Sequence, residues 1–239
     1  TCTPSYRVVA DIPLGTAPKA QDLRALPGNY CFATSPPITL DWLFVDPDAG
    51  ASESAYEIQI DEDPAFGSPI VRVPPVTTVP ADTVLNNTRQ GYSPTLAYGT
   101  TYYWRVRVWD DVDIASPWTY PLSLPGDPPS SAPGTSFTTQ LPYPDPRGFD
   151  WTPAIPGANE QAQFQDNNTF LGIPGARSWL WNFGDANSST LEDPAHAYAA
   201  QGTYSVSLQA CAGGTRCCTA VKPLRVSIPF PGWIEVSPF

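Results

Sequence analysis

Proline is the residue that most limits what this chain can form. It accounts for 30 of the 239 residues, more than double its usual share of about 5%. Because proline lacks a backbone N–H and its ring clashes with the preceding helical turn, a chain this rich in proline cannot be largely helical. No stretch has sustained helical periodicity, and residues 19–26 are expected to form one or two helical turns at most. We therefore expect an all-β protein.

Alternating apolar residues predict a complete β-sandwich over residues 30–140, because side chains on a strand point to opposite faces in turn. The residues expected to face its core are Ile38, Leu40, Trp42, Phe44, Tyr56, Ile58, Ile60, Tyr102, Trp104, Val106 and Val108. The run around Tyr102 resembles strand F of fibronectin type III domains. The resemblance implies that Tyr102 is the tyrosine-corner residue and that Trp42 is the buried tryptophan of the sheet.

A second sandwich is expected over residues 151–228. Trp181 and Phe183 lie two apart, on one face of a strand that ends at Gly184 and Asp185. The spacing of a larger set resembles the signature of the PKD domain, an immunoglobulin-like sandwich of secreted and surface proteins. This set comprises Trp181, Phe183, Gly184, Asp185, His196, Tyr198, Gly202 and Tyr204. The resemblance implies a spacer, an adhesive module or a filament building block, and it points away from catalysis. Ala186 departs from the pattern, since the family usually has glycine there.

The first residues form an arm with one apolar face. Tyr6, Val8, Ala10, Ile12 and Leu14 alternate with mainly polar residues, as in a strand that needs a partner. Residues 16–29 are expected to be a connector long enough to let this arm reach a neighbouring molecule. The arm is therefore a candidate donor strand, which either pairs with another copy or folds back on its own chain.

The expected architecture is two immunoglobulin-like sandwiches in tandem, between an N-terminal arm and an apolar C-terminal tail. The segments are an arm and connector (1–29), a fibronectin type III-like sandwich (30–140), a proline-rich hinge (141–150), a PKD-like sandwich (151–228) and a tail (229–239). This order resembles surface proteins of uncultured bacteria. With its orphan arm, it is also similar to subunits of pilus-like fibrils held by an exchanged N-terminal strand.

The charge of the chain excludes several partners. A net charge of −11 disfavours nucleic acid and anionic membrane surfaces. No apolar run is long enough to span a membrane. The sequence has no methionine and begins at Thr1, so we expect either a mature secreted protein that has lost a leader or a domain fragment.

Five cysteines in such a chain favour disulfides in an oxidising compartment. Cys211 faces either Cys217 or Cys218 across a hairpin with Gly-Gly at its tip, close enough for a bridge. Because adjacent strand residues point to opposite faces, only one of the two can take that role. The other is left for Cys2 or Cys31, and one cysteine stays free or pairs with another chain.

Two acidic loops are a candidate calcium site. Asp46 and Asp48 follow one strand, and Asp110, Asp111 and Asp113 follow another. In an immunoglobulin-like sandwich these loops share one pole, where carboxylates could bind Ca²⁺ weakly. The alternative is a solvated acidic rim, with no cofactor of any kind.

Neither catalysis nor glycosylation has a strong signal. His196 is the only histidine and lacks a recognisable nucleophile, so we expect a structural role for it and no enzyme activity. Three sequons begin at Asn86, Asn167 and Asn187, all in expected loops, and they make glycans possible partners.

The first functional hypothesis is a structural subunit of an extracellular bacterial pilus-like fibril. Its partner would be itself, in head-to-tail contacts made by N-terminal strand exchange. The alternative is a secreted carbohydrate- or surface-binding accessory module of a larger adhesin or enzyme. A binding module would be monomeric and self-contained, whereas a fibril subunit would polymerise.

Overall fold

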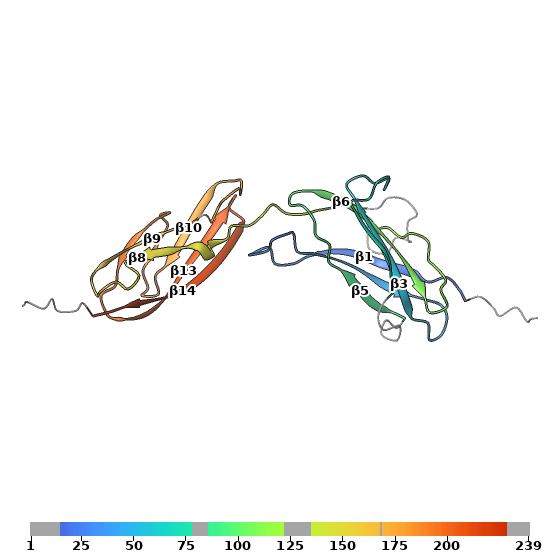
Figure 1. The fold of residues 1–239 in the computed structure, drawn as a ribbon, viewed down its shortest axis with the longest axis horizontal. Coiled ribbons are helices and arrows are strands. Elements are labelled where there is room, and N and C mark those ends of the chain that lie inside the picture. Colours follow the sequence, from blue (N-terminus) through green and yellow to red (C-terminus); the bar gives the residue numbers. More distant parts are fainter. Residues whose placement is uncertain (1–14, 78–85, 122–134, 168, 229–239) are drawn as a thin grey trace, which may run out of the picture. The chain divides into compact units, whose positions relative to one another are not determined.

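The computed structural model describes residues 15–77, 86–121, 135–167 and 169–228. These residues are all-β apart from one short 3-10 helix, η1 (Pro146–Gly148). The chain divides into two compact units, one of Thr1–Gly28 with Ser35–Gln140 and one of Asn29–Thr34 with Leu141–Phe239 (Figure 1). The predicted tandem of β-sandwiches is confirmed. The donor strand (Tyr6, Val8, Ala10, Ile12 and Leu14), Cys2 and the tail at 229–239 lie outside the described residues.

The described residues of the first unit form two antiparallel sheets, one of three strands and one of four. The order of the smaller sheet is β1 (Lys19–Pro27), β2 (Ile38–Val45) and β5 (Thr88–Tyr92). The order of the larger sheet is β4 (Val71–Thr77), β3 (Glu53–Asp61), β6 (Thr101–Asp110) and β7 (Phe137–Thr138). Trp42 and Trp104, one from each sheet, are among the fully buried side chains of its core. The backbone N–H of Ala97 donates to the hydroxyl of Tyr102 at 3.0 Å, a contact of the kind expected of a tyrosine corner.

The expected connector at 16–29 is wrong, because most of it is strand β1, paired with β2. Ala20 and Leu23 are both buried although they lie three apart, which breaks the two-residue period of a strand. The register shifts between Gln21 and Arg24, and Asp22 has a φ of +46°. Such a bulge adds one residue to the strand and returns Leu23 to the inner face.

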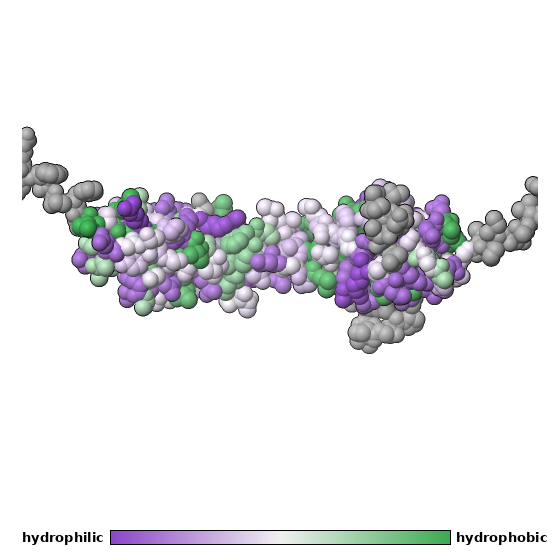
Figure 2. All heavy atoms as spheres, turned by 90° about the horizontal axis from the view of Figure 1, so that it is seen from below, coloured by the Kyte–Doolittle hydropathy of each residue, from purple (hydrophilic) through white to green (hydrophobic). Residues whose placement is uncertain are grey.

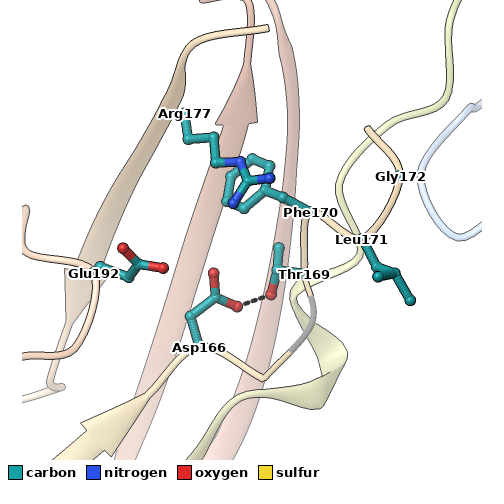
Figure 3. Close-up of a pocket in the computed structure, with 7 residues that line it drawn as sticks. All are labelled: Asp166, Thr169, Phe170, Leu171, Gly172, Arg177 and Glu192. Atoms are coloured by element: carbon teal, nitrogen blue, oxygen red, sulfur yellow. Dashed lines mark hydrogen bonds between the residues drawn. The ribbon is translucent and has the colours of Figure 1, made fainter. Parts of the chain in front are cut away.

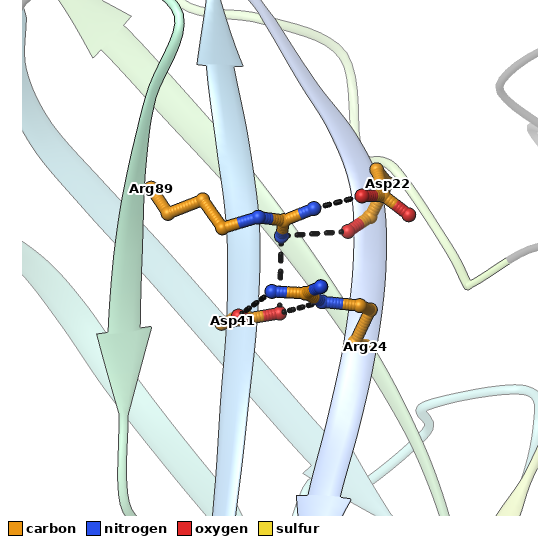
Figure 4. Close-up of polar contacts among 4 residues, drawn as sticks. All are labelled: Asp22, Arg24, Asp41 and Arg89. Carbon is orange, nitrogen blue, oxygen red and sulfur yellow. Dashed lines mark hydrogen bonds and ion pairs between the residues drawn. The ribbon is translucent and has the colours of Figure 1, made fainter.

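Four charged side chains join the three strands of this sheet (Figure 4). Arg24 of β1 binds both carboxylate oxygens of Asp41 in β2, at 2.9 and 2.5 Å. Arg89 of β5 reaches the same carboxylate at 3.2 Å and also pairs with Asp22. These contacts cross β1, β2 and β5 and so hold β1 in the sheet.

Arginines and aromatic rings alternate on the outer side of the larger sheet. The guanidinium of Arg105 lies 4.4 Å from the ring of Phe66 and 4.5 Å from that of Trp118. Arg107 lies 4.8 Å from Trp118 and 4.9 Å from Trp109. Each arginine also binds a polar side chain of β3, so cation–π contacts and hydrogen bonds together cover this face.

The second unit is also a sandwich of two antiparallel sheets. One sheet has the order β11 (Ser188–Ser189), β10 (Arg177–Asn182), β13 (Gly202–Ala212) and β14 (Arg216–Val226). The other has the order β12 (Ala195–Ala197), β9 (Gln161–Gln165) and β8 (Asp150–Thr152). Aromatic rings fill the space between them. Trp181 meets Phe149 at a centroid distance of 5.3 Å and Phe164 at 5.5 Å.

The proline-rich hinge expected at 141–150 is packed structure of the second unit. Phe149 is fully buried in its core, and Lys222 of β14 donates to the Phe149 carbonyl. Arg216 donates to the carbonyl of Pro142 at 2.5 Å. The prolines concealed this because their frequency suggested a linker, whereas the segment has its own buried aromatic anchor.

The surface shows no broad apolar face in the view drawn. Figure 2 shows hydrophilic and hydrophobic residues interspersed over that side. Within the described ranges, no helix is both long and apolar enough to cross a membrane.

Candidate binding pocket in the second unit

A pocket of about 310 Å³ opens at one end of the second unit. Its lining comes from three places in the sequence: the segment that follows β9, the start of β10, and the turn between β11 and β12. The lining residues are Asp166, Thr169, Phe170, Leu171, Gly172, Arg177 and Glu192 (Figure 3). The pocket therefore depends on loops that the sandwich brings together.

Asp166 forms the floor of the pocket and organises the loop after β9. Its carboxylate accepts hydrogen bonds from the hydroxyl of Thr169 and from the indole N–H of Trp179, the latter at 2.6 Å. Burial raises the pKa of Asp166, and the nearby charges of Glu192 and Asp193 raise it further, while the Trp179 hydrogen bond opposes the shift. The Asp166 carboxylate thus lies close to two other negatively charged carboxylates.

Arg177 and Phe170 form the opposite wall. Phe170 is buried and packs against Trp179 at a centroid distance of 5.5 Å. The guanidinium of Arg177 lies 5.3 Å from the centre of the Phe170 ring. Figure 3 shows this guanidinium over the ring, on the side of the pocket away from the Asp166 carboxylate. Within the part of the chain that the structure describes, no carboxylate forms an ion pair with Arg177.

Glu192 closes the third side, and the core of the unit fixes its position. The indole N–H of Trp181 donates to the carbonyls of Leu191, at 3.0 Å, and of Glu192, at 3.3 Å. The Glu192 side chain faces the same space as Asp166 and Arg177 (Figure 3). A buried core tryptophan thereby sets the backbone of one pocket wall.

The pocket has groups suited to binding. One guanidinium offers hydrogen-bond donors, and two carboxylates offer acceptors, around the edge of an aromatic ring. Hydroxyl, amide and charged groups of a ligand can all be matched by this set. The Thr169 hydroxyl donates a hydrogen bond to Asp166. The Asp166 carboxylate therefore orients the loop and does not activate a nucleophile.

The PKD-type residues gather in the core and its corner, and Trp181 among them also contacts the pocket wall at Glu192. Phe183 stacks on His196 at 4.2 Å, and the hydroxyl of Tyr198 donates to the Phe183 carbonyl at 3.1 Å. Nε2 of His196 lies 2.8 Å from the carboxylate of Asp185. Burial raises the pKa of Asp185, but hydrogen bonds from His196 and Asn187 outweigh it, so the net shift is downward.

The remaining residues of this set shape the turns. Tyr204 donates to the carbonyl of Ala200 at 2.9 Å. Gly184 has a φ of +82°, and its position leaves no room for a side chain, since a Cβ would lie 2.8 Å from the backbone of Ser205. Ala186, where the family usually has glycine, also has a positive φ, +71°. The departure noted in the sequence thus falls at a position where glycine would be favoured.

The five aspartates do not assemble a calcium site. Asp46 accepts the backbone N–H of Asp48 at 2.7 Å, and Asp110 accepts those of Val112 and Ile114 at 3.1 and 2.7 Å. Burial raises the pKa of Asp46, and the charges of Asp48, Asp110 and Asp111 add to the shift, so the two loops do lie close. Asp113 has a positive φ in the same turn. Among the residues in the described ranges, no group of three or more acidic, histidine or cysteine side chains is placed to hold a metal.

The disulfide pairing in the structure decides which of the alternatives left open by the sequence is correct. Cys211 pairs with Cys217 across the β13–β14 hairpin. Cys218 pairs with Cys31, which precedes it by 187 residues. The sequence left Cys211, Cys2 and Cys31 as possible partners of Cys218, and only the tertiary structure places Cys31 beside β14.

The sequon asparagines differ in availability. Asn86 uses its side-chain amide twice, accepting from the Asp46 N–H at 2.9 Å and donating to the Asp46 carbonyl at 2.5 Å. Its amide nitrogen, the atom a glycan would take, is therefore engaged. Asn187 is exposed, and its side chain bonds Asp185. Asn167 is exposed as well, beside the pocket floor.

Sequence patterns did not predict the pocket. Asp166, Arg177 and Glu192 have no motif spacing, and each would pass for an ordinary loop charge. The one usable clue was that Asp166 and Arg177 flank strands of the PKD-type sandwich, whose loops meet at its ends.

Two family models match the chain, one in each half. Residues 150–226 match the PKD domain, and residues 29–124 match the N-terminal immunoglobulin domain of Rha78A-like proteins. The PKD resemblance and the immunoglobulin-like character of the first sandwich are therefore confirmed. The resemblance to pilus-like fibril subunits is not shown by these two matches and stays a prediction.

Similar proteins include a collagenase and an α-L-rhamnosidase, of which this chain matches only a small part. A stretch of 50 residues is 44% identical to collagenase ColA of Bacillus cereus, and it spans 21% of this chain but 5% of the collagenase. The α-L-rhamnosidase of Streptomyces avermitilis, solved with L-rhamnose, is 17% identical over 87% of this chain and 24% of its own, with a TM-score of 0.32. The FN1–FN3 domains of chicken CNTN1 are 9% identical over 87% of this chain and 69% of theirs, with a TM-score of 0.34.

Proposed function

We propose that this chain is a non-catalytic accessory module of a larger extracellular enzyme or adhesin, and that it binds carbohydrate or another surface polymer. The observation that supports this most is the pair of family matches. Both halves match immunoglobulin-like module types, and the matched stretch of the collagenase is a small fraction of that enzyme. PKD domains and disulfides are typical of extracellular proteins.

The pocket of the second unit is the proposed contact site. Arg177 presents its guanidinium without a carboxylate partner among the described residues, opposite Asp166 and Glu192. Polymers with many hydroxyl or amide groups can bind to this arrangement by hydrogen bonds, with the buried Phe170 ring supporting the arginine from beneath. A binding role needs no nucleophile or base, which agrees with the structural positions of His196 and Thr169.

Pull-down on insoluble polymers tests the proposal. The probes are fibrillar collagen and a rhamnose-containing polysaccharide, chosen because the similar enzymes bear those names. We expect the wild-type chain to bind at least one probe, and Arg177→Ala and Glu192→Gln each to weaken that binding about tenfold, as for loss of a charged hydrogen bond. Arg225→Ala, an exposed arginine of β14, is the matched control and should bind as the wild type does. Failure to bind either polymer, or binding unaffected by the pocket variants, contradicts this assignment.

Self-assembly through the N-terminal arm stays a prediction. Its donor residues, Tyr6, Val8, Ala10, Ile12 and Leu14, lie outside the described residues. Sedimentation of the full chain beside a variant lacking residues 1–14 separates the two functions. Polymers that require the arm would favour the fibril hypothesis, and a full-length monomer at high concentration would favour the accessory module.

A further inference from the structure

The Cys31–Cys218 disulfide closes a very long loop. Cys31 lies between β1 and β2, near the beginning of the described chain, and Cys218 lies in β14, its last strand. The bond therefore encloses residues 32–217, which include the strands from β2 to β13. The Cα atoms of the two cysteines are 5.6 Å apart.

The short segment around Cys31 is held in the second unit by more than this bond. Residues Asn29–Thr34 belong to that unit, although the strands on either side of them belong to the first. Tyr30 is buried, and its ring lies 5.5 Å from that of Tyr143. The guanidinium of Arg147 lies 4.5 Å from the ring of Phe32. Both ends of the disulfide are thus anchored in one compact unit.

From this connectivity, we infer that the disulfide is a covalent bypass for mechanical tension. A force that pulls the chain between a point before Cys31 and a point after Cys218 passes through the sulfur–sulfur bond. Residues 32–217 then carry none of that tension and cannot be drawn out, even if their strands separate. Only the residues outside the loop can extend, namely β1 with its flanks and the last part of β14.

The bypass has a calculable size. With at most about 3.6 Å of length per extended residue, the enclosed residues represent roughly 670 Å of hidden contour length. The described residues outside the loop, 15–31 and 218–228, represent about 100 Å on the same basis. Opening one bond therefore increases the available extension of the described chain several-fold.

The second disulfide supplies a matched control. Cys211 and Cys217 both lie inside the enclosed loop, so their bond takes no part in the path of the force. Removing it changes the same kind of covalent link in the same unit and leaves the bypass intact. The mechanical effect is therefore specific to one of two disulfides that occupy adjacent residues of β14.

Optical-tweezers extension of the full chain tests the inference, with handles attached at its two ends by chemistry that does not use cysteine. All proteins carry Cys2→Ser, so that the remaining cysteine cannot exchange. We expect Cys31→Ser/Cys218→Ser to yield roughly 670 Å more total contour length than the oxidised parent. Cys211→Ser/Cys217→Ser should match the parent, and peptide mapping without reductant should find the Cys31–Cys218 bond in both.

A reductant provides a second route if the double variant fails to fold. Dithiothreitol opens the parent's bond by two thiol–disulfide exchanges, in which its own two thiols become a cyclic disulfide and each cysteine sulfur gains a proton. Molecules held partly extended in dithiothreitol should then lengthen by the same increment. Full extension of the oxidised parent, or a short extension after the bond is opened, would overturn the bypass.

Discussion

The two sandwiches share an architecture but are held together by different interactions. Of the buried polar or charged residues found in the described ranges, all but Thr169 lie in the first unit. Ion pairs join the strands of its smaller sheet, and contacts between arginines and aromatic rings cover the outer side of its larger sheet. The second unit instead has a nearly continuous aromatic core around Trp181, and both disulfides of the described chain. Both units thus have apolar cores, but the first adds buried and cross-strand polar contacts to its core, whereas the second adds covalent links.

This difference has a functional consequence. In the second unit the core reaches the pocket directly, since Trp181 holds the backbone of Glu192 and Trp179 holds the carboxylate of Asp166. In the first unit, buried carboxylates instead accept hydrogen bonds within turns, as at Asp46 and Asp110, or pair with arginines across strands. A rigid aromatic core is the better support for a binding site built on loops, because the loops take their positions from buried side chains.

The largest expected effect is that of Trp181→Ala. The variant leaves a cavity among Phe149 and Phe164 and should lower the free energy of unfolding of the second unit by about 3–5 kcal/mol. Because the indole also fixes Glu192, binding at the pocket should weaken too. A urea titration followed by ¹H–¹⁵N NMR resolves the two units, and Trp118→Ala is the control at a half-buried tryptophan. If Trp181→Ala lowered the free energy of unfolding of both units equally, the aromatic core would not be a feature that stabilises the second unit separately.

The second expected effect is a pH dependence of the first unit that arises from Glu53. Burial raises the pKa of Glu53 to about 8, against the opposing effect of Trp42. The folded unit therefore keeps a proton that the unfolded chain releases above its ordinary pKa of about 4.3, and the free energy of unfolding falls as the pH rises between these values. The fall should amount to a few kcal/mol, since one pKa unit corresponds to about 1.4 kcal/mol.

Glu53→Gln is the variant that isolates this effect. It removes the titrating group, so the stability of the first unit should become nearly flat between pH 5 and 9, as measured by urea titration at several pH values. Glu62→Gln, at an exposed carboxylate, should leave the wild-type slope unchanged. A slope that persists in Glu53→Gln would assign the pH dependence to another group.

The sequence predicted what depends on local periodicity. Val206 and Leu208 in the second unit, and Leu40, Trp42 and Phe44 in the first, face their cores as their two-residue spacing requires. The prediction from periodicity was wrong at β1, where a bulge at Asp22 leaves the buried residues Ala20 and Leu23 three positions apart instead of two. The position of a bulge depends on how β1 pairs with β2, and the sequence of β1 by itself does not determine that pairing.

Long-range features needed the tertiary structure. The acidic loops do lie close, but the sequence could not tell that one carboxylate oxygen each of Asp46 and Asp110 would accept backbone N–H groups of its own loop. The pocket has the same origin, because Asp166, Arg177 and Glu192 meet only when three loops are in place. Likewise, the partner of Cys218 depended on where residues 29–34 pack.

A smaller effect is expected from the corner of the second unit. The hydrogen bonds from His196 and Asn187 leave the pKa of Asp185 below its ordinary value, despite the opposing effect of burial. The stabilisation is therefore present above the unfolded pKa of about 3.9 and is lost as the pH falls through the folded value. Asp185→Asn should cost about 1–2 kcal/mol at pH 7 and much less at pH 3, by acid titration of the second unit's NMR signals. Asp150→Asn, at an exposed carboxylate, is the control, and an equal loss at both pH values would rule out a role for the ionised Asp185 carboxylate.

The smallest expected effect is that of Asp41→Asn, which disconnects the charged residues of β1, β2 and β5. Asp41 accepts from both Arg24 and Arg89, but Arg24 is exposed and can turn to water when its partner is lost. We expect the first unit to lose at most about 1 kcal/mol of unfolding free energy, as for other pairs at a surface. Most of that loss should vanish in 1 M NaCl, where the screening length is about 3 Å. Asp111→Asn, at an exposed carboxylate of the same unit, provides the matched control for urea titrations at low and high salt. A loss that survives high salt would mean that Asp41 acts through packing, as the residues of the second unit do, and the two halves would then differ less in how they are held than their buried residues indicate.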